Sequence, residues 1–149
     1  MRWIDNMSNQ RTVIVSNVIK HKDSFLLGRK RCTGKIFLPG GKVEESEILE
    51  NTFWRELEEE TNLKKPKDFN LRKLSYLGLF EFIKKKEHFL VLYFLSNYHG
   101  QMGYVHNNEP EKCSELFWES WKDSIKRPIE DFNYRTAYFY QKIIKEMEL

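Results

Sequence analysis

Short apolar runs separated by turn residues fill the first forty positions of the chain. Residues 11–20 are rich in β-branched side chains and predict a strand, and residues 24–31 predict a second strand after a turn at 21–23. A shorter apolar run at 36–38 stops at Pro39-Gly40-Gly41, a sequence that breaks regular structure. The chain is therefore expected to begin with β-structure that ends at a glycine loop.

The next segment, residues 46–61, has the pattern of a helix. It contains neither Gly nor Pro and is dominated by Glu, Leu and Arg. Ser46 is a suitable N-cap, and Asn62 suits the left-handed backbone conformation that ends many helices. The sequence therefore predicts one acidic helix directly after the glycine loop.

The second half of the chain continues with mixed elements. The pattern predicts a hairpin of two strands, a polar loop, a further strand and a final helix, in that order at 74–83, 88–98, 99–112, 115–121 and 133–147. Hairpins rather than regular βαβ crossovers connect the strands. We therefore expect an α+β fold with a mixed β-sheet between helices.

The composition is that of a single folded domain. The chain has 149 residues, of which 40% are hydrophobic and 15% aromatic, which is too much apolar material for a disordered protein. We expect one domain over residues 1–149, with residues 1–10 as a flexible N-terminal segment. The longest apolar run, Phe89–Leu95, is too short to cross a membrane, so no membrane partner is expected.

Net charge and cysteine usage exclude further classes of protein. A formal charge of +3 is too weak to indicate a stable nucleic-acid partner. The two cysteines, Cys32 and Cys113, form no CxxC pair, and no histidine spacing indicates a zinc site. The first ten residues lack the pattern of a secretory signal, so we expect a cytoplasmic protein with reduced thiols.

Negative charge is concentrated in the predicted helix and the segment before it. Eight Glu residues fall between Glu44 and Glu60. At 100° per residue, Glu56, Glu59 and Glu60 share an arc of about 100° on one helix face, whereas Glu58 lies on the far side. Carboxylates that share a face repel each other, and a hard divalent cation such as Mg²⁺ would remove that cost. A solvated acidic surface helix is the alternative that the helix alone leaves open.

The glycine loop before the helix favours the cation. Leu38-Pro39-Gly40-Gly41 brings backbone without side chains close to the start of the helix, where a ligand can approach closely. A backbone carbonyl of this loop is a further hard oxygen ligand.

The segment GKVEESEILENTFWRELEEETNL, which begins at Gly41, resembles the signature of the Nudix hydrolase family. The signature is Gly, five residues, Glu, seven residues, Arg-Glu, an aliphatic residue, any residue, Glu-Glu, any residue, Gly and an aliphatic residue. The positions that match in register are Gly41, Glu47, Arg55, Glu56, Leu57, Glu59, Glu60 and Leu63. Asn62 departs from the pattern, because the family has Gly there. Asn is the next best residue for a left-handed helix end, so we expect the turn to be kept.

The resemblance implies a fold and a role for each matching residue. It implies a Nudix-type α/β/α sandwich, with a divalent metal, Mg²⁺ or alternatively Mn²⁺, bound by Glu56, Glu59, Glu60 and the carbonyl of Gly40. Arg55 would orient the carboxylates, and Glu47 would pair with Arg55 and fix the loop to the helix. Family members cleave a diphosphate linkage by attack of water at phosphorus. Glu56 is the first candidate for the general base, and Glu109 or Glu111 from a later loop are the alternatives.

A second stretch bears on the substrate. Asn108-Glu109-Pro110-Glu111-Lys112-Cys113, with Trp118 further on, resembles the MutT-like nucleoside triphosphate group of this family. This implies hydrolysis of nucleoside triphosphates, including oxidised or modified deoxynucleotides, to the monophosphate and pyrophosphate. ADP-ribose, a dinucleoside polyphosphate or capped RNA are alternative substrates. A module that binds a nucleotide without turnover ranks lower, because the signature carboxylates are all present.

The expected partner is a small-molecule nucleotide bound to a monomer or a homodimer. The candidate substrate-binding residues are Arg29, Gly41, Phe132, Asn133 and Tyr134, with Lys30, Phe80 and Phe82 as further candidates. Aromatic rings can stack on a base, although core packing is the favoured role for each of these aromatic residues. Arg29 and Lys30 stand where the second strand ends, from which they could reach phosphates.

Overall fold

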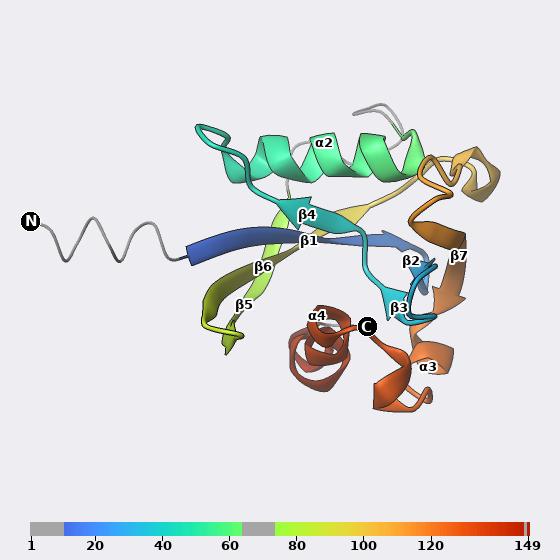
Figure 1. Ribbon diagram of the computed structural model, residues 1–149. Coiled ribbons are helices and arrows are strands. Elements are labelled where there is room, and N and C mark those ends of the chain that lie inside the picture. The colour runs from blue at the N-terminus through green and yellow to red at the C-terminus, as the bar shows by residue number, and fades with distance from the viewer. Residues whose placement is uncertain (1–10, 64–73, 148) are drawn as a thin grey trace, which may run out of the picture.

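A seven-stranded mixed sheet lies between helices in the computed structural model (Figure 1). The structure describes residues 11–63, 74–147 and 149, so the expectation for residues 1–10 lies outside the described part. The strands are β1 (Arg11–His21), β2 (Ser24–Lys30), β3 (Ile36–Phe37), β4 (Gly40–Lys42), β5 (Ser75–Lys84), β6 (Glu87–Asn97) and β7 (Cys113–Ser120). The α-helices are α2 (Leu49–Thr61), α3 (Trp121–Ser124) and α4 (Tyr134–Tyr138).

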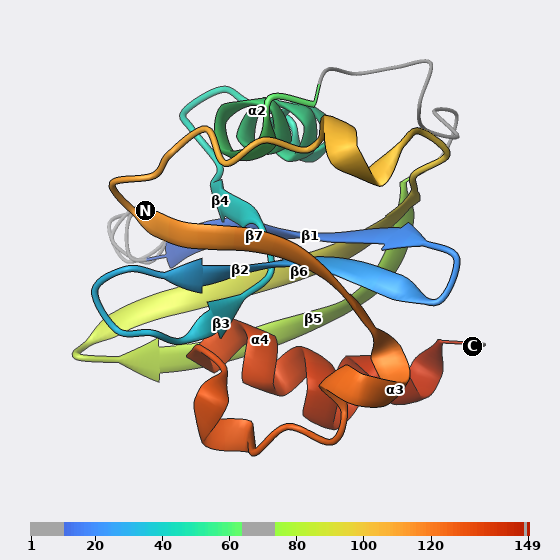
Figure 2. The same ribbon diagram turned by 90° about the vertical axis from the view of Figure 1, so that its right-hand side faces the viewer.

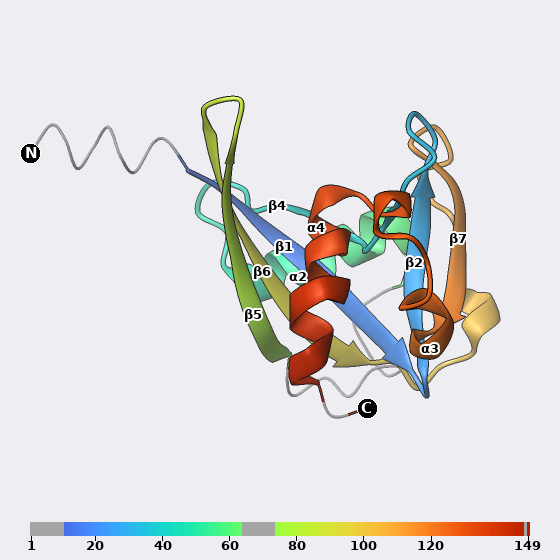
Figure 3. The same cartoon turned by 90° about the horizontal axis from the view of Figure 1, so that it is seen from below.

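The sheet divides into two branches that meet at one hairpin. In the first branch β1 pairs parallel with β6, from Arg11 opposite His88 to Lys20 opposite Asn97, and β5 pairs antiparallel with β6. In the second branch β2 pairs antiparallel with β3 and β7. β1 and β2 pair only next to their turn, and β4 pairs with β1 further back along the strand. The two branches therefore diverge away from the β1–β2 turn (Figure 3).

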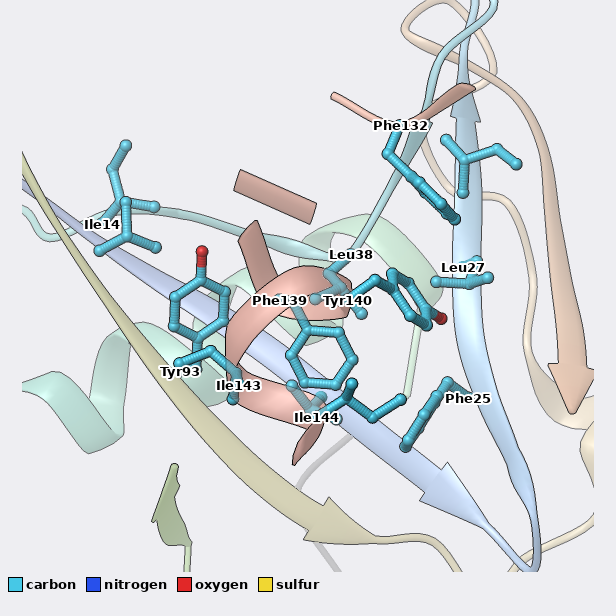
Figure 4. Close-up of a cluster of buried hydrophobic side chains, with 13 residues drawn as sticks. Ile14, Phe25, Leu27, Leu38, Tyr93, Phe132, Phe139, Tyr140, Ile143 and Ile144 are labelled. Atoms are coloured by element: carbon cyan, nitrogen blue, oxygen red, sulfur yellow. The ribbon is translucent and has the colours of Figure 1, made fainter. Parts of the chain in front are cut away.

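Residues 14–19 of β1 are all buried, and their side chains alternate between two hydrophobic clusters on opposite faces of the sheet. Ile14 and Val18 pack in the cluster that includes residues of α4, whereas Val15 and Ile19 pack in the cluster that includes residues of α2. Figure 4 shows the first cluster around the last helix, and Figure 2 shows α2 on one face of the sheet with α3 and α4 on the other. The expected α+β sandwich with a mixed sheet between helices is confirmed.

Helix α2 is held by its apolar stripe, and its end is as predicted. Phe53, Trp54 and Leu57 are buried, and each such side chain contributes about 1.5–3 kcal/mol relative to exposure. Asn62 follows the helix at φ 61° and donates its N–H to the carbonyl of Glu58. Asn therefore supplies the left-handed residue that the signature assigns to Gly.

The start of α2 differs from the prediction. The helix begins at Leu49 after Ile48, with no side-chain cap, and Ser46 is not an N-cap because it lies in a turn at φ 63°. The carboxylate of Glu47 accepts hydrogen bonds from the N–H of Glu44 and the hydroxyl of Thr52. These hydrogen bonds hold the segment around Glu47 in a turn, so the helix cannot begin before Leu49.

Other boundaries also differ. The glycine pair, predicted only to break structure, forms β4, and β7 begins at Cys113 rather than at 115. The predicted helix 133–147 is α4 followed by a π-helical turn at Phe139–Ile143 and a 3₁₀ turn at Ile144–Glu146. The predicted polar loop at 99–112 contains a 3₁₀ turn at Met102–Tyr104, and another 3₁₀ turn at Ile129–Asp131 precedes α4.

Two further observations concern membrane-spanning helices and the cysteines. Among the described residues, no helix is long and apolar enough to span a membrane. Cys32 is exposed and Cys113 is buried, and both are free thiols.

Candidate active site

Arg55 connects the loop before α2 to the polar face of the helix. Its Nε and Nη2 donate to the two carboxylate oxygens of Glu47 at 2.7 and 3.0 Å. Its Nη1 lies 2.9 Å from Oε1 of Glu56 and 3.3 Å from Oε2 of Glu59. The pairing of Arg55 with Glu47 expected from the sequence is therefore present. One guanidinium is shared among these three carboxylates.

The pKa values of the two nearer carboxyl groups shift in opposite directions, although Arg55 acts to lower both. The hydrogen bonds from Arg55 lower the pKa of Glu47 to about 2, with a smaller contribution from Thr52. Burial raises the pKa of Glu56, and the carboxylates of Glu59 and Glu109 add to the rise, although Arg55 opposes it. For Glu56 the loss of water therefore outweighs the neighbouring positive charge.

Glu60 points from the last turn of α2 toward the glycine loop. Its Oε1 accepts the N–H of Gly40 at 2.8 Å. Burial raises the pKa of Glu60 to about 8, and the carboxylates of Glu56 and Glu109 add to the rise. Gly40 has φ 147°, and a Cβ there would stand 2.2 Å from the carbonyl oxygen of Val15. Only glycine therefore lets the backbone reach Glu60 at this point.

Glu109 reaches the same region from the loop between β6 and β7. The neighbouring Asn108 donates its backbone N–H to the carbonyl of Glu60 at 3.1 Å and its side-chain amide to the carbonyl of Glu59 at 3.2 Å. Carbonyls at the C-terminal end of a helix lack donors within the helix, and Asn108 supplies the missing donors. They also fix the loop that carries Glu109 against α2.

Four carboxylates line one cavity of about 240 Å³, which we call the acidic cavity. Its polar lining is formed by Gly40, Glu56, Glu59, Glu60, Glu109 and three cationic side chains, Lys30, Lys112 and Arg135. The structure therefore brings together the predicted metal-binding residues, among them the first candidate base Glu56, and the alternative base Glu109. Glu111 is exposed and does not line this cavity. Arg55 does not line it either, but is bonded to two of its carboxylates.

The donor set of the acidic cavity fits a hard divalent cation. The carboxylates of Glu59 and Glu109 raise the pKa of Glu56, and those of Glu56 and Glu109 raise the pKa of Glu60, so negative charge there is under-compensated. Glu58, Glu59 and Glu60 also stand at the C-terminal end of α2, where the helix dipole is negative. Glu58 is exposed, as expected from its place on the far side of the helix. A cation bound to oxygen ligands would relieve both costs.

The carboxylates are not arranged as a finished ligand set. Within the part of the chain that is described, no three His, Cys, Asp or Glu side chains converge on one point. Glu56 and Glu59 turn toward Arg55, and Glu60 turns toward the Gly40 N–H. Binding a metal would therefore require rotation of these side chains away from their present donors.

A second cavity, of about 750 Å³, adjoins the first, and we call it the aromatic cavity. Its side chains include Phe82, Phe89, Phe132 and Tyr134, the cations Lys30, Lys35, Lys84 and Arg135, and the polar residues Thr33, Asn133 and Gln141. None of the described residues that line it is acidic. Lys30 and Arg135 line both cavities, so they mark the junction between them.

The predicted substrate-binding aromatic residues occupy different environments in this cavity. Tyr134 is 56% exposed, and its ring centroid lies 4.8 Å from that of Phe82 and 5.4 Å from that of Phe80. Phe132 is buried and stacks on Tyr140 with a centroid distance of 4.7 Å. Phe132 is thus mainly a core residue, and Tyr134 is the ring available to a ligand.

Two of the other candidates have structural partners instead of an open site. Arg29 lines neither cavity, because it pairs with Glu115 at 3.1 Å and donates to the carbonyl of Gly34 at 2.9 Å. Gly41 also lines neither cavity, and a Cβ there would stand 2.3 Å from the carboxyl carbon of Glu56. Its role in the structure is to make room for Glu56.

Asn133 lines the aromatic cavity while capping a helix. Its Oδ1 accepts the backbone N–H of Thr136 at 3.0 Å, so Asn133 is the N-cap of α4. Its side-chain amide nitrogen has no partner among the described residues and is available to a ligand.

Sequence reasoning missed Arg135 and Lys112. Lys112 lies within the stretch 108–113 that was singled out, so its proximity to Glu109 was a usable signal. Arg135 carries no local signal. It follows the cap of the last helix, and its cavity neighbours Lys30, Glu56 and Glu60 are far away in the sequence.

Comparisons with known proteins agree with this architecture. The model of the Nudix domain family matches residues 8–142. Among solved structures, a MutT Nudix hydrolase from Burkholderia pseudomallei aligns with a TM-score of 0.70 and 24% identity, over 90% of this chain and 98% of that one. A MutT protein from Methanosarcina mazei Go1 aligns with a TM-score of 0.71 and 20% identity, over 91% and 94% of the two chains.

The ORF135 protein of E. coli aligns with a TM-score of 0.69 and 17% identity, over 91% of this chain and 90% of that one. No curated protein sequence matches the chain significantly. At these identities the structural neighbours establish the fold, whereas the family match spans nearly the whole chain. The chain therefore belongs to the Nudix family of hydrolases and is a pyrophosphohydrolase.

Proposed function

We propose that this enzyme hydrolyses nucleoside triphosphates to the nucleoside monophosphate and pyrophosphate, with Mg²⁺ as its cofactor. The observation that carries the proposal is the junction of an acidic cavity with an aromatic, cationic one. A nucleotide has a phosphate chain that needs cations and a base that needs apolar faces. The two cavities offer these environments side by side.

Glu56, Glu59, Glu60 and the carbonyl of Gly40 are the proposed metal ligands. All four residues line the acidic cavity, and all supply the hard oxygen atoms that Mg²⁺ prefers. Arg55 holds Glu56 and Glu59 on the same side of the helix before the metal binds. When bound, Mg²⁺ would neutralise phosphate oxygens and lower the pKa of a coordinated water.

Glu56 is the proposed general base. Burial raises its pKa, which makes its carboxylate a better proton acceptor near neutral pH. Arg55 binds Oε1 of Glu56, so Oε2 is available to accept the proton of the attacking water. Glu109 is the alternative base, because it lines the same cavity from another element.

The base of the nucleotide is proposed to occupy the aromatic cavity. Tyr134 and Phe82 supply ring faces, and stacking on an aromatic side chain is worth about 1–3 kcal/mol per base. Asn133 offers its amide N–H₂ to an acceptor on the base edge, because its oxygen is already occupied by the helix cap. The stretch at 108–113 supports the triphosphate assignment only through its resemblance to the MutT-like group.

A substrate panel tests this proposal. Purified protein with Mg²⁺ at alkaline pH is incubated with the common and oxidised nucleoside triphosphates, ADP-ribose, dinucleoside polyphosphates and capped RNA, and the products are separated by chromatography. Monophosphate and pyrophosphate from a triphosphate are the expected products. Ribose 5-phosphate and AMP from ADP-ribose, without triphosphate cleavage, would contradict the substrate assignment. Binding without turnover of any compound would contradict catalysis.

A further inference from the structure

Arg135 stands where the two cavities meet. It is the second residue of α4, and its backbone carbonyl accepts a hydrogen bond of 2.7 Å from the hydroxyl of Tyr93 on β6. The cap made by Asn133 and the bond from Tyr93 fix the helix turn from which the side chain starts. The side chain lines both the acidic cavity and the aromatic cavity.

The guanidinium of Arg135 has no anionic partner of its own. Among the described residues, no carboxylate lies within 4 Å of it and no hydrogen bond from it is formed, whereas Arg29, Arg55 and Arg127 each pair with a carboxylate. The charges that act on it from a greater distance are those of Glu60 and Glu56, and burial lowers its pKa.

A largely buried cation without a partner is costly, because it loses water and gains no compensating contact. Arg135 is not among the described residues whose side-chain nitrogens are both fully buried and without a hydrogen bond. Its N–H donors are therefore accessible from the cavities that it lines. The five donors of a guanidinium form a planar fork that matches two oxygens of a phosphate. An anion bound in the cavities would therefore supply the partner that the guanidinium of Arg135 lacks.

The phosphate chain of a nucleotide must pass the junction to reach the acidic cavity from a base in the aromatic cavity. Lys30 is the other residue at the junction, but its Nζ lies 5.5 Å from the ring centre of Phe37 and carries only a point charge. We infer that Arg135 binds the phosphate attached to the nucleoside, and so determines which phosphorus lies over the acidic cluster. This inference rests on the proposed function and names the unit recognised at the site, a nucleoside 5′-phosphate.

Binding measurements without metal test Arg135 apart from catalysis. Calorimetric titrations in EDTA compare AMP, GMP, CMP and UMP, each with its unphosphorylated nucleoside, on the wild type, Arg135→Gln and Arg135→Lys. We expect Arg135→Gln to weaken binding of the preferred monophosphate by about tenfold or more, on the scale of a charge-assisted contact. Affinity for the nucleoside should change less than about twofold, on that same scale. Arg135→Lys should restore part of the difference.

The matched control is Arg11→Gln. Arg11 is an exposed arginine on β1 that lines neither cavity, so its loss changes the net charge equally without affecting binding. Thermal unfolding of each variant verifies that it is folded, and Arg135→Lys remains informative if Arg135→Gln fails this check.

Four outcomes would overturn the inference. An equal loss of monophosphate and nucleoside affinity in Arg135→Gln would show that Arg135 maintains the shape of the pocket and does not contact the phosphate. Unchanged monophosphate affinity assigns the phosphate contact to another residue. A wild type that hydrolyses triphosphates yet binds monophosphate no better than nucleoside refutes the inference while the proposed function stands. Failure of the wild type both to hydrolyse and to bind nucleotides refutes the two together.

Discussion

Arg55 illustrates how a single side chain can prepare a site. It carries one positive charge and contacts Glu47, Glu56 and Glu59, so negative charge exceeds positive charge around it. The contact with Glu47 is the shortest of the three and fixes the loop, whereas the other two are longer and hold carboxylates of the acidic cavity. Arg55 therefore holds these carboxylates close together but does not neutralise their combined negative charge.

The acidic cluster gives a direct prediction for activity. Replacing Glu56 or Glu60 by Gln should each lower kcat by about 100-fold or more, the scale of losing a general base or a metal ligand. Glu58→Gln is the matched control on the same helix turn, because Glu58 is exposed and outside the cavity. Steady-state kinetics on the best substrate of the panel measure the effect. Equal losses at 58 and 60 would contradict the assignment of the helix face.

The stability of the protein should depend on the ionisation of Glu60. Burial raises its pKa from 4.5 to about 8, so between these pH values the folded protein holds a proton that the unfolded chain releases. The free energy of unfolding therefore falls as pH rises through this window. Glu60→Gln cannot ionise, and at pH 8 it should be more stable than the wild type by at least about 1 kcal/mol.

Urea unfolding at pH 5 and at pH 8, in EDTA, measures this difference. At pH 5 the carboxyl of the wild type is mostly protonated, so the gap between the two proteins should be small. A Glu60→Gln variant that loses stability equally at both pH values would show that Glu60 contributes by packing and hydrogen bonding alone.

Several site residues could be predicted because their relations are local. The 100° step of a helix places Glu56, Glu59 and Glu60 together, and the signature spacing pairs Arg55 with Glu47. Arg135 could not be predicted, because the packing of α4 against distant strands decides its neighbours. The ion pair of Arg29 could not be predicted for the same reason, since the β2–β7 register sets Glu115 opposite it.

At the scale of elements, the C-terminal end of α2 is closed from two sides. Asn62 ends the helix in the left-handed conformation, and its N–H satisfies the carbonyl of Glu58. The loop after β6 satisfies the next three carbonyls, through Asn108 to Glu59 and Glu60 and through His106 to Thr61. The helix that carries the carboxylates and the loop that carries Glu109 are therefore one unit.

Substitutions at position 62 test the helix end. Asn62→Ala should lower the free energy of unfolding by about 1 kcal/mol, because alanine tolerates φ 61° less well than asparagine. Asn62→Gly should keep or raise stability, since glycine adopts this conformation without strain. Thermal or urea unfolding of the three proteins gives the order. Equal stability of the Ala and Gly variants would show that backbone conformation at 62 is not limiting.

Element boundaries were less predictable than element types. Ser46 has the chemistry of an N-cap, but Glu47 folds back onto Thr52 and Arg55, and these tertiary bonds delay the helix to Leu49. The final helix contains a π-helical turn whose residues Phe139, Tyr140 and Ile143 are buried. Periodicity alone cannot reveal such a turn, because packing against the sheet selects it.

At the scale of the whole molecule, the division of the sheet makes room for the site. β1 and β4 lie in one branch, whereas β2, β3 and β7 lie in the other. The acidic cavity is lined from both, by Gly40 of β4 and by Lys30, Phe37 and Leu116 of the second branch. The alternating pattern predicted the strands and the mixed sheet, but strand order and this divergence depend on contacts between distant segments.

Metal binding at the proposed site should oppose the fall in stability with rising pH. Mg²⁺ competes with the proton on Glu60, so its stabilising effect should be larger at pH 8 than at pH 5. At 100 times its Kd, a ligand adds about 2.7 kcal/mol to the free energy of unfolding. Thermal unfolding with EDTA, Mg²⁺ or Mn²⁺ measures the shift. The increase in melting temperature caused by the metal should be smaller in Glu60→Gln than in the wild type. An equal increase in the two proteins would show that the metal binds elsewhere.

The late position of α4 in the chain has a consequence for synthesis. A growing polypeptide that has emerged only as far as β7 already carries every carboxylate of the cluster. It still lacks Arg135, Tyr134 and the apolar residues Phe139, Tyr140 and Ile143 that cover one side of the sheet. Such an intermediate would expose an apolar surface, and the proposed nucleotide site would stay incomplete until α4 has folded onto the sheet.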